Sequence, residues 1–441
     1  MAAHLQDSYG QGYDSGFNAG YDRGYEDGFR QGFEAGRAGN GFSGTSIVIP
    51  TYNQLDCLRQ CVESIRRETP EPHEIIVVDN GSADGTREWL HGERGRLRYH
   101  LNDANRGFAG AVNQGLRMAR GATIVILNND TLVTPNWLSN LLACVYSGPQ
   151  VGLAGPVTNY IGGEQQIDTG YGDDLDEMRR FAAAHNGGDP AKWRKVTRII
   201  GFCLMMRRDV FHRLGYFDEG FEIGNCEDDD YGLRARLLGC DLVVAGDTFI
   251  HHFGSVSMKA LLDRFDEVYG RNLDYYSRKW EDPHSLPAEI GETGVLRHMC
   301  DFYPSHVLVR GCGQRPYWIE GGVRYGLEAP PPDLEPVRVS QLDLKGWPAA
   351  GMLTPGEVEQ RRALLTSLPP SHPLPDGSCV TAGDGRVYQI AGGRLRRFVS
   401  ELAVERWGFA GRVVRVEVSR IAHLAPGLPI IAPPVLHNPH L

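Results

Sequence analysis

The chain has 441 residues, of which 41% are hydrophobic, so it can bury a large core and divide into two or three domains. Its formal net charge is −10 and its pI is about 5.8, and no basic block offsets the acidic side chains. This balance argues against a nucleic-acid-binding protein, which has to neutralise phosphates.

Export and membrane insertion are not expected from this sequence. Residues 1–8 lack the basic start and the apolar segment of a signal peptide, and no apolar run approaches the ~18 residues that a membrane-spanning helix needs. The nine cysteines are scattered and odd in number, which disfavours a disulfide framework. We expect a cytoplasmic protein, either free or held at the inner face of the membrane.

Residues 1–43 form a tail with a period of four residues. A glycine recurs at every fourth position from Gly12 to Gly36, and Tyr or Phe follows each one up to Gly32. On a helix this places a glycine groove beside an aromatic ridge. Glycine costs about 1 kcal/mol per helical position, so such a helix needs a partner in the groove, and we predict a homo-oligomer. The alternative is a flexible low-complexity tail. The repeat resembles the glycine repeats of Yae1-like proteins, which pack as helices.

Residues 44–285 alternate short apolar runs with amphipathic segments, which predicts an α/β domain with a largely parallel sheet and right-handed crossovers. The predicted strands are Ser46–Pro50, Glu74–Val78, Leu97–Leu101, Thr123–Leu127 and Asp241–Ala245. The predicted helices are Leu55–Glu68, Gly85–Leu90, Gly110–Ala119, Trp137–Ser147 and Asp229–Leu238.

Residues 286–441 are rich in Pro and Gly and contain an internal repeat. Val309–Gly322 and Val380–Gly393 both alternate apolar residues and then end in Gly-Gly, a pattern typical of a β-hairpin. We predict a β-rich domain with two related modules, at about 300–328 and 371–430, and a helix near Pro355–Ser367.

Polar residues end three of the predicted strands. Thr51 and Asn53 follow the first strand, Asp79 ends the second, and Asn128-Asn129-Asp130 follows the fourth. In an open α/β sheet the carboxyl ends of parallel strands form the ligand crevice, so these side chains should converge there. Asp79 could accept hydrogen bonds from a base or ribose. Asp130 could bind Mg²⁺ or Mn²⁺ together with phosphate oxygens.

Two later motifs carry further candidate groups. Four consecutive acids, Glu227 to Asp230, stand at a helix start, where the helix dipole favours negative charge and capping alone is one interpretation. The other interpretations are a general base for an acceptor hydroxyl and a Ca²⁺ site, although the spacing is not that of an EF-hand. The pair His251-His252 could ligate a metal or touch a diphosphate, or could be a surface feature.

Together these motifs resemble family 2 glycosyltransferases, most closely the rhamnosyltransferase-like branch. The resemblance covers about 240 residues and rests on six motifs in family order: Pro50–Asn53, Val78–Ser82, Asn105–Asn113, Asn128–Asp130, Glu227–Arg234 and His251–Ser255. It implies a GT-A fold, a nucleoside-diphosphate sugar donor, Mg²⁺ or Mn²⁺, and single-displacement transfer with inversion.

The resemblance also implies roles for individual residues. Asp228 would be the catalytic base, supported by Glu227. The metal would be bound by Asp130 and His252, with His251 as an alternative, and Asn128 replaces the first acid of the metal motif. The nucleotide-sugar-binding residues would be Thr51, Asn53, Asp79, Gly107, Asn113, Asn129 and Arg234.

Several questions stay open at this level. The donor could be dTDP-rhamnose or a UDP-hexose, and the acceptor a glycan, a lipid-linked glycan or a protein, including the tyrosines of the tail. A Gln-x-x-Arg-Trp motif is missing, with Tyr275–Trp280 as the nearest approach, which favours single additions in polysaccharide biosynthesis. The C-terminal modules could bind the acceptor or another subunit, or serve packing alone. The alternative functions are a catalytically idle sugar-binding module and a nucleotidyltransferase, although no glycine-rich phosphate loop follows the first strand.

Overall fold

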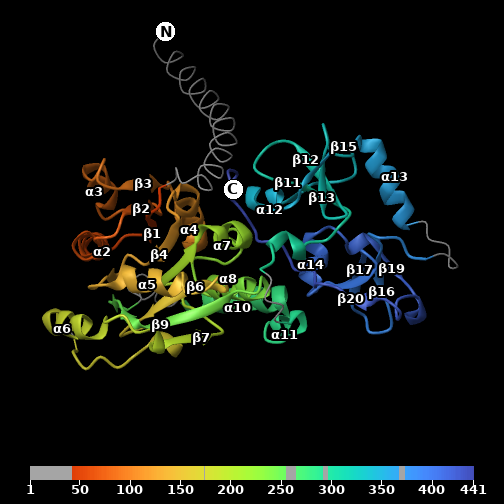
Figure 1. Ribbon diagram of the computed structural model, residues 1–441. Coiled ribbons are helices and arrows are strands. Elements are labelled where there is room, and N and C mark those ends of the chain that lie inside the picture. Colours follow the sequence, from red (N-terminus) through yellow and green to blue (C-terminus); the bar gives the residue numbers. More distant parts are fainter. Residues whose placement is uncertain (1–41, 173, 255–264, 292–295, 367–372) are drawn as a thin grey trace, which may run out of the picture.

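The computed structural model describes residues 42–172, 174–254, 265–291, 296–366 and 373–441. The predicted N-terminal helix therefore lies outside the described residues. Within them, an α/β domain and a β-rich region lie side by side along the long axis of the molecule, and the C-terminus lies between them (Figure 1).

The α/β domain is built on a sheet of eight strands in the order β3-β2-β1-β4-β8-β6-β9-β7. These strands are β1 (Thr45–Thr51), β2 (His73–Asp79), β3 (Arg98–Leu101), β4 (Thr123–Leu127), β6 (Val151–Val157), β7 (Trp193–Val196), β8 (Cys203–Arg207) and β9 (Asp241–Phe249). A separate two-stranded sheet pairs β5 (Thr131–Leu132) with β10 (His251–His252).

The prediction of a largely parallel sheet is confirmed, because six of the eight strands run in one direction, including β6 and β9, which pair in parallel. β1 runs parallel to both β2 and β4, and β2 parallel to β3. β8 is antiparallel to β4 and β6, and β7 is antiparallel to β9, so the sheet is mixed. The sequence analysis did not predict β6, β7 or β8.

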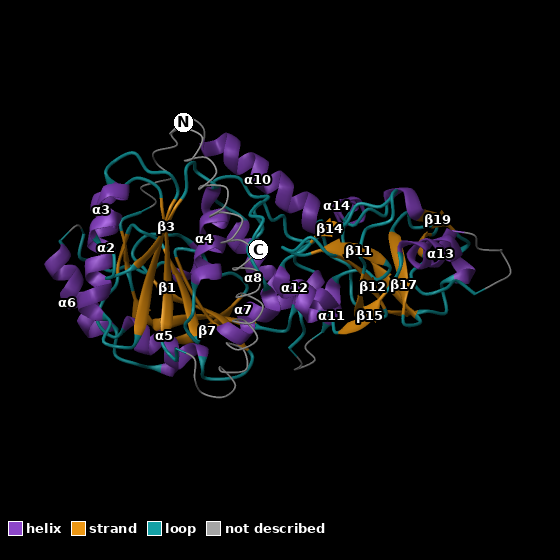
Figure 2. Cartoon of the chain, turned by 90° about the horizontal axis from the view of Figure 1, so that it is seen from above, coloured by secondary structure: helices purple, strands orange, loops and turns teal. Residues whose placement is uncertain are grey.

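Helices cover both faces of this sheet (Figure 2). They are α2 (Leu55–Glu68), α3 (Thr86–Gly92), α4 (Gly107–Met118), α5 (Trp137–Val145), α6 (Leu175–His185), α7 (Arg208–Leu214), α8 (Glu227–Leu237), α10 (Phe265–Trp280) and α11 (Leu286–Ile290).

Side chains of β1 alternate between the two faces, as a pleated strand requires. Ile47 and Ile49 are buried with Leu58 and Val62 of α2 on one face, whereas Val48 is buried with α4 and α8 on the other.

The β-rich region contains two five-stranded sheets with the same connectivity. Their orders are β14-β11-β12-β13-β15 and β19-β16-β17-β18-β20, and in both an antiparallel meander is flanked by parallel outer strands. The first contains β11 (Val307–Arg310), β12 (Pro316–Glu320), β13 (Val323–Gly326), β14 (Val337–Arg338) and β15 (Ala349–Met352). The second contains β16 (Cys379–Thr381), β17 (Val387–Ala391), β18 (Arg394–Arg397), β19 (Val413–Arg415) and β20 (Ala425–Pro426).

Three helices accompany these sheets, α12 (Gln341–Gly346), α13 (Pro355–Thr366) and α14 (Glu401–Arg406). Short 3₁₀ helices occupy Gly163–Gln165, Pro190–Lys192, Met299–Phe302, Ala410–Arg412 and Val418–Arg420. The β-rich C-terminal region was expected, while the predicted domain and module boundaries stay a prediction.

A cavity of about 540 Å³ lies between the two sheets, lined in part by Ser305, His306, Glu320 and Asp376.

The chain end returns to the α/β domain. The Val435 carbonyl accepts a hydrogen bond from the N–H of Glu219, and the Val435 N–H donates to the carboxylate of Asp218, each at 2.9 Å. Among the helices of the described ranges, none combines the length and the apolar character needed to cross a membrane.

Candidate active site

The carboxyl ends of β2, β1 and β4 lie next to one another, because these strands are neighbours and parallel. Thr51 ends β1, Asp79 ends β2 and Asn129 follows β4. The Asn129 amide donates to the Thr51 hydroxyl at 2.8 Å, which joins the ends of β4 and β1 directly. The predicted convergence of polar strand ends is therefore present.

Asp79 and Asn53 shape the loops that follow their strands. The Asp79 carboxylate accepts hydrogen bonds from the Ser82 hydroxyl (2.5 Å) and backbone N–H (3.2 Å), and the Asn53 N–H donates to the same hydroxyl at 2.7 Å. The Asn53 side chain in turn accepts from the N–H of Ala83. Asn53 has a φ of 56°, a left-handed conformation that asparagine tolerates better than most residues. These contacts fix the loops after β1 and β2, and we call the polar groups at the ends of β1, β2 and β4 (Thr51, Asn53, Asp79 and Asn129) the bay.

Gly107 borders the bay at the first residue of α4. Its carbonyl accepts a hydrogen bond from Asn80, whose side-chain oxygen accepts from Asn102 at 3.0 Å. Asn80 is 4% exposed and was not predicted as a site residue, although it follows Asp79 directly in a quoted motif.

Asp130 and His252 face each other across the short β5–β10 ladder. The Asp130 Oδ1 lies 3.2 Å from the His252 Nε2, and the other ring nitrogen lies 2.7 Å from the Tyr160 carbonyl oxygen. When that nitrogen donates to the carbonyl, Nε2 presents a lone pair to a carboxylate oxygen. Two such acceptors need a proton or a cation between them.

This pair is a plausible donor set for a divalent cation, because imidazole nitrogen and carboxylate oxygen both ligate Mn²⁺, and carboxylate oxygen also suits Mg²⁺. Within the described part of the chain, no group of three His, Cys, Asp or Glu side chains could hold a metal ion. The remaining ligands would therefore come from the substrate. His251 instead lies beside the Tyr171 hydroxyl at 2.8 Å.

The acid cluster, Glu227 to Asp230, forms the first turn of α8, and its first three carboxyl groups differ in their surroundings. The Asp228 carboxylate accepts from the backbone N–H of Gly201 (3.0 Å) and of Asp229 (2.9 Å), which fixes its orientation. Burial, together with the charges of Asp228 and Asp229, raises the pKa of Glu227 well above its usual range. Burial and Asp228 raise the pKa of Asp229 to about 7, opposed by its 2.5 Å ion pair with Arg198.

Gly201 and Phe202 connect the acid cluster to the metal-binding candidates. Gly201 donates to Asp228, while the Phe202 carbonyl accepts from the N–H of Asn128 at 2.8 Å. The Phe202 ring also stacks on His252, with a centroid distance of 5.4 Å. The two residues before β8, Gly201 and Phe202, thus contact both the acid cluster and His252. The sequence patterns did not predict this connection.

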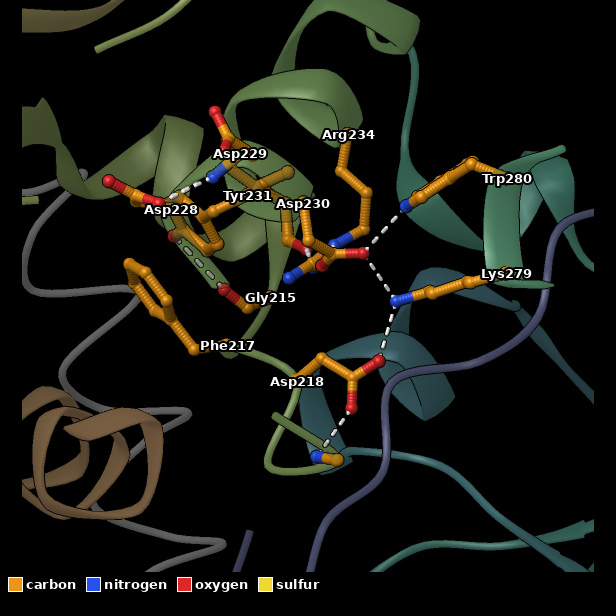
Figure 3. A network of polar contacts seen from close by, with 12 residues as sticks. Gly215, Phe217, Asp218, Asp228, Asp229, Asp230, Tyr231, Arg234, Lys279 and Trp280 are labelled. Carbon is orange, nitrogen blue, oxygen red and sulfur yellow. Dashed lines mark hydrogen bonds and ion pairs between the residues drawn. The ribbon is translucent and has the colours of Figure 1, made fainter. Parts of the chain in front are cut away.

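Two predicted ligand-binding residues are instead engaged inside the protein. Arg234 is fully buried and donates a hydrogen bond to the Asp230 carboxylate at 2.8 Å (Figure 3). Asn113 is also fully buried and exchanges hydrogen bonds with the backbone of Phe217. Both side chains are thus held inside the protein, and their assignment to nucleotide binding stays a prediction.

A mixed α/β sheet with this bay, an Asp–His pair and an acid-bearing helix defines the GT-A type of glycosyltransferase fold. Residues 46–215 match the family model "Glycosyl transferase family 2".

Three relatives with known names each match about half of this chain. Validoxylamine A glucosyltransferase of Streptomyces hygroscopicus is 34% identical over 240 residues, which are 46% of this chain and 50% of that protein. Glycosyltransferase AglE of Haloferax volcanii is 26% identical over 56% of this chain and 86% of its own. O-antigen biosynthesis protein RfbC of Myxococcus xanthus is 28% identical over 56% of this chain but only 20% of its own. The chain thus spans half or less of the length of two of these three relatives.

Among solved structures, GalNAc-T7 with UDP, GalNAc and Mn²⁺ superposes with a TM-score of 0.40 and 19% identity, covering 57% of this chain and 52% of that one. This overlap is too low to transfer a ligand or a metal.

Proposed function

We propose that the chain is an inverting glycosyltransferase that moves a sugar from a nucleoside-diphosphate sugar to an acceptor hydroxyl. The observation that carries the proposal is that the bay, the Asp130–His252 pair and the acid cluster lie around one end of the sheet, linked by Gly201 and Phe202. Among the four acids, Asp228 accepts a backbone N–H at each of its carboxylate oxygens, one from Gly201 and one from Asp229.

Asp228 would act as the general base. It takes the proton of the acceptor hydroxyl while the hydroxyl oxygen bonds to the anomeric carbon and the bond to the diphosphate breaks. Because attack and departure occur on opposite faces, the anomeric configuration inverts. Glu227 precedes Asp228 in the chain, and burial together with the charges of Asp228 and Asp229 raises the pKa of Glu227 well above its usual range.

The donor would lie in the bay (Thr51, Asn53, Asp79 and Asn129), beside Gly107. Mg²⁺ or Mn²⁺, held by Asp130 and His252, would neutralise charge on the departing diphosphate. The name of the glucosyltransferase relative fits a hexosyl donor, and that of RfbC fits a polysaccharide acceptor. A rhamnosyl donor, as the motifs suggest, is the competing choice.

The test is a panel of nucleotide sugars with Mg²⁺ or Mn²⁺, with released nucleoside diphosphate as the signal. Wild type is compared with Asp130→Ala and Asp228→Asn. We expect metal-dependent release from one donor, a large loss in Asp130→Ala, and no transfer in Asp228→Asn, which still binds the donor.

Controls separate the possible failures. Retained transfer in Asp228→Asn would remove this residue from the role of base. Nucleotide binding without release, also in the presence of glycan, lipid-linked and peptide acceptors, would favour the idle sugar-binding module. Asp56→Asn, on exposed helix surface, is the matched control and should leave release unchanged.

A further inference from the structure

The segment that leads into the acid helix has an unusual backbone. Ile223, Asn225 and Cys226 have φ values of 56°, 83° and 68°, so three non-glycine residues within four positions are left-handed. For a β-branched residue such as Ile223 this conformation is a clear outlier. Strain of this kind persists only where neighbouring groups enforce it.

Asn272 of α10 enforces this conformation. Its side-chain amide donates to the carbonyl oxygens of Glu222 (2.9 Å), Gly224 (2.8 Å) and Asn225 (3.2 Å). Its amide oxygen accepts from the N–H of Glu222 at 2.9 Å. The side chain is 1% exposed, so every polar atom of a buried amide is used on one strained loop.

The same loop contacts the donor bay on its other side. The Ile223 carbonyl accepts a hydrogen bond from the N–H of Phe108 at 2.6 Å, next to Gly107. A Cβ on Gly107 would lie 3.2 Å from the Ile223 nitrogen, so the two backbones are in close contact. A shift of this loop would therefore change the start of α8 relative to the bay.

A second contact fixes α10 to the first turn of α8. Lys279 lies two helical turns after Asn272 and bridges Asp218 (2.6 Å) and Asp230 (2.5 Å), with all three side chains fully buried (Figure 3). Helix α10 thus contacts both the loop at residues 222–226 and Asp230 in the first turn of α8.

We propose that Asn272 is a positioning residue, which sets the place of Asp228 relative to the donor bay by holding the left-handed loop at residues 222–226. The proposal rests on the proposed function for its catalytic consequence. Asn272 touches neither donor nor acceptor, and it acts through the loop.

The experiment compares Asn272→Ala and the isosteric Asn272→Asp with wild type. Asp keeps the volume and the acceptor but replaces the donors with a charge that faces carbonyl oxygens. The matched control is Arg271→Ala, which removes a solvent-exposed ion pair to the same loop residue, Glu222. The readouts are kcat, KM for the donor, and hydrogen exchange of peptides covering 222–231.

For both Asn272 variants we expect kcat to fall by roughly 10–100-fold, the scale of a misplaced catalytic group. Donor KM should stay within about threefold because Asn272 itself contacts none of the bay residues, and loop exchange should become faster. Arg271→Ala should match wild type in all three measurements.

Folded variants with wild-type kcat and exchange would overturn the proposal. Failure of both variants to fold would also overturn it, because Asn272 would then determine folding rather than the position of Asp228. If the wild type transfers no sugar, the proposed function fails, and the exchange measurement alone decides whether Asn272 holds the loop.

Discussion

Replacement of Lys279 by methionine tests the buried charge network behind the acid helix. Lys279 and Arg234 are the cations, and Asp218 and Asp230 the anions, and all four side chains are fully buried. In wild type the charges balance. Lys279→Met leaves two carboxylates, 2.6 and 2.5 Å from the former ammonium position, with Arg234 as their remaining cation.

The expected cost is large because a charge in a buried network loses its partner. Breaking such a pair costs about 3–5 kcal/mol, a sizeable part of the roughly 5–15 kcal/mol that stabilises a typical domain. The double variant Asp218→Asn, Lys279→Met removes one anion together with the cation and so restores the balance. We expect it to recover most of the lost free energy of unfolding.

The pH dependence gives a second, independent check. Burial opposes ionisation of Asp230, but Lys279 and Arg234 outweigh it and hold the pKa of Asp230 below its usual value. Its contribution to wild-type stability is therefore present above the unfolded-state pKa and is lost as pH falls through the lower folded-state pKa. In Lys279→Met an unpaired carboxyl takes up a proton on folding, so that variant becomes less stable as pH rises.

Urea denaturation at several pH values measures both effects. The stability difference between wild type and Lys279→Met should be largest near neutral pH and should shrink toward about pH 4.5. A single variant as stable as wild type, a double variant no better than the single one, or a difference that widens on acidification would refute this reasoning.

Three further predictions concern the site and the tail. Arg198→Met removes the cation paired with Asp229 and should raise the pKa of Asp229 above about 7, measured by NMR titration of the carboxyl carbon; an unchanged pKa would contradict it. His252→Ala should weaken Mn²⁺ binding in the presence of nucleoside diphosphate by about tenfold or more, measured by titration calorimetry, since it removes one of two protein ligands. Deletion of residues 1–40 should lower the oligomeric mass in light scattering without abolishing donor hydrolysis, and an unchanged mass would show that the tail does not assemble the protein.

Local sequence was sufficient for the part of the fold with local signals. Apolar runs ending in Thr, Asn or Asp predicted β1, β2 and β4 to within one or two residues, and the predicted helix Leu55–Glu68 matches α2. The glycine-terminated repeat likewise predicted paired β structures at the C-terminus. These features depend on side-chain period and turn chemistry within about 15 residues, which a sequence displays directly.

Other elements carried no such signal. β8 (Cys203–Arg207) is buried on both faces, so its residues do not alternate, and its antiparallel place between β4 and β6 depends on pairing with distant strands. The predicted start of α8 at Asp229 was two residues late because Cys226 is a left-handed cap with no side-chain hydrogen bond, which no capping pattern would indicate.

The sequence by itself determined which residues could do chemistry: the polar strand ends, Asp130, Asp228 and His252. Only the tertiary structure decided which of the motif residues are engaged inside the protein. Arg234 and Asn113 stand in the same motifs but turn inward, to Asp230 and to the backbone of Phe217. Asn272 lies 50 residues from Glu222, the loop residue it holds. The physical reason is that buried polar groups must find partners, and those partners are chosen by packing in space rather than by position along the chain.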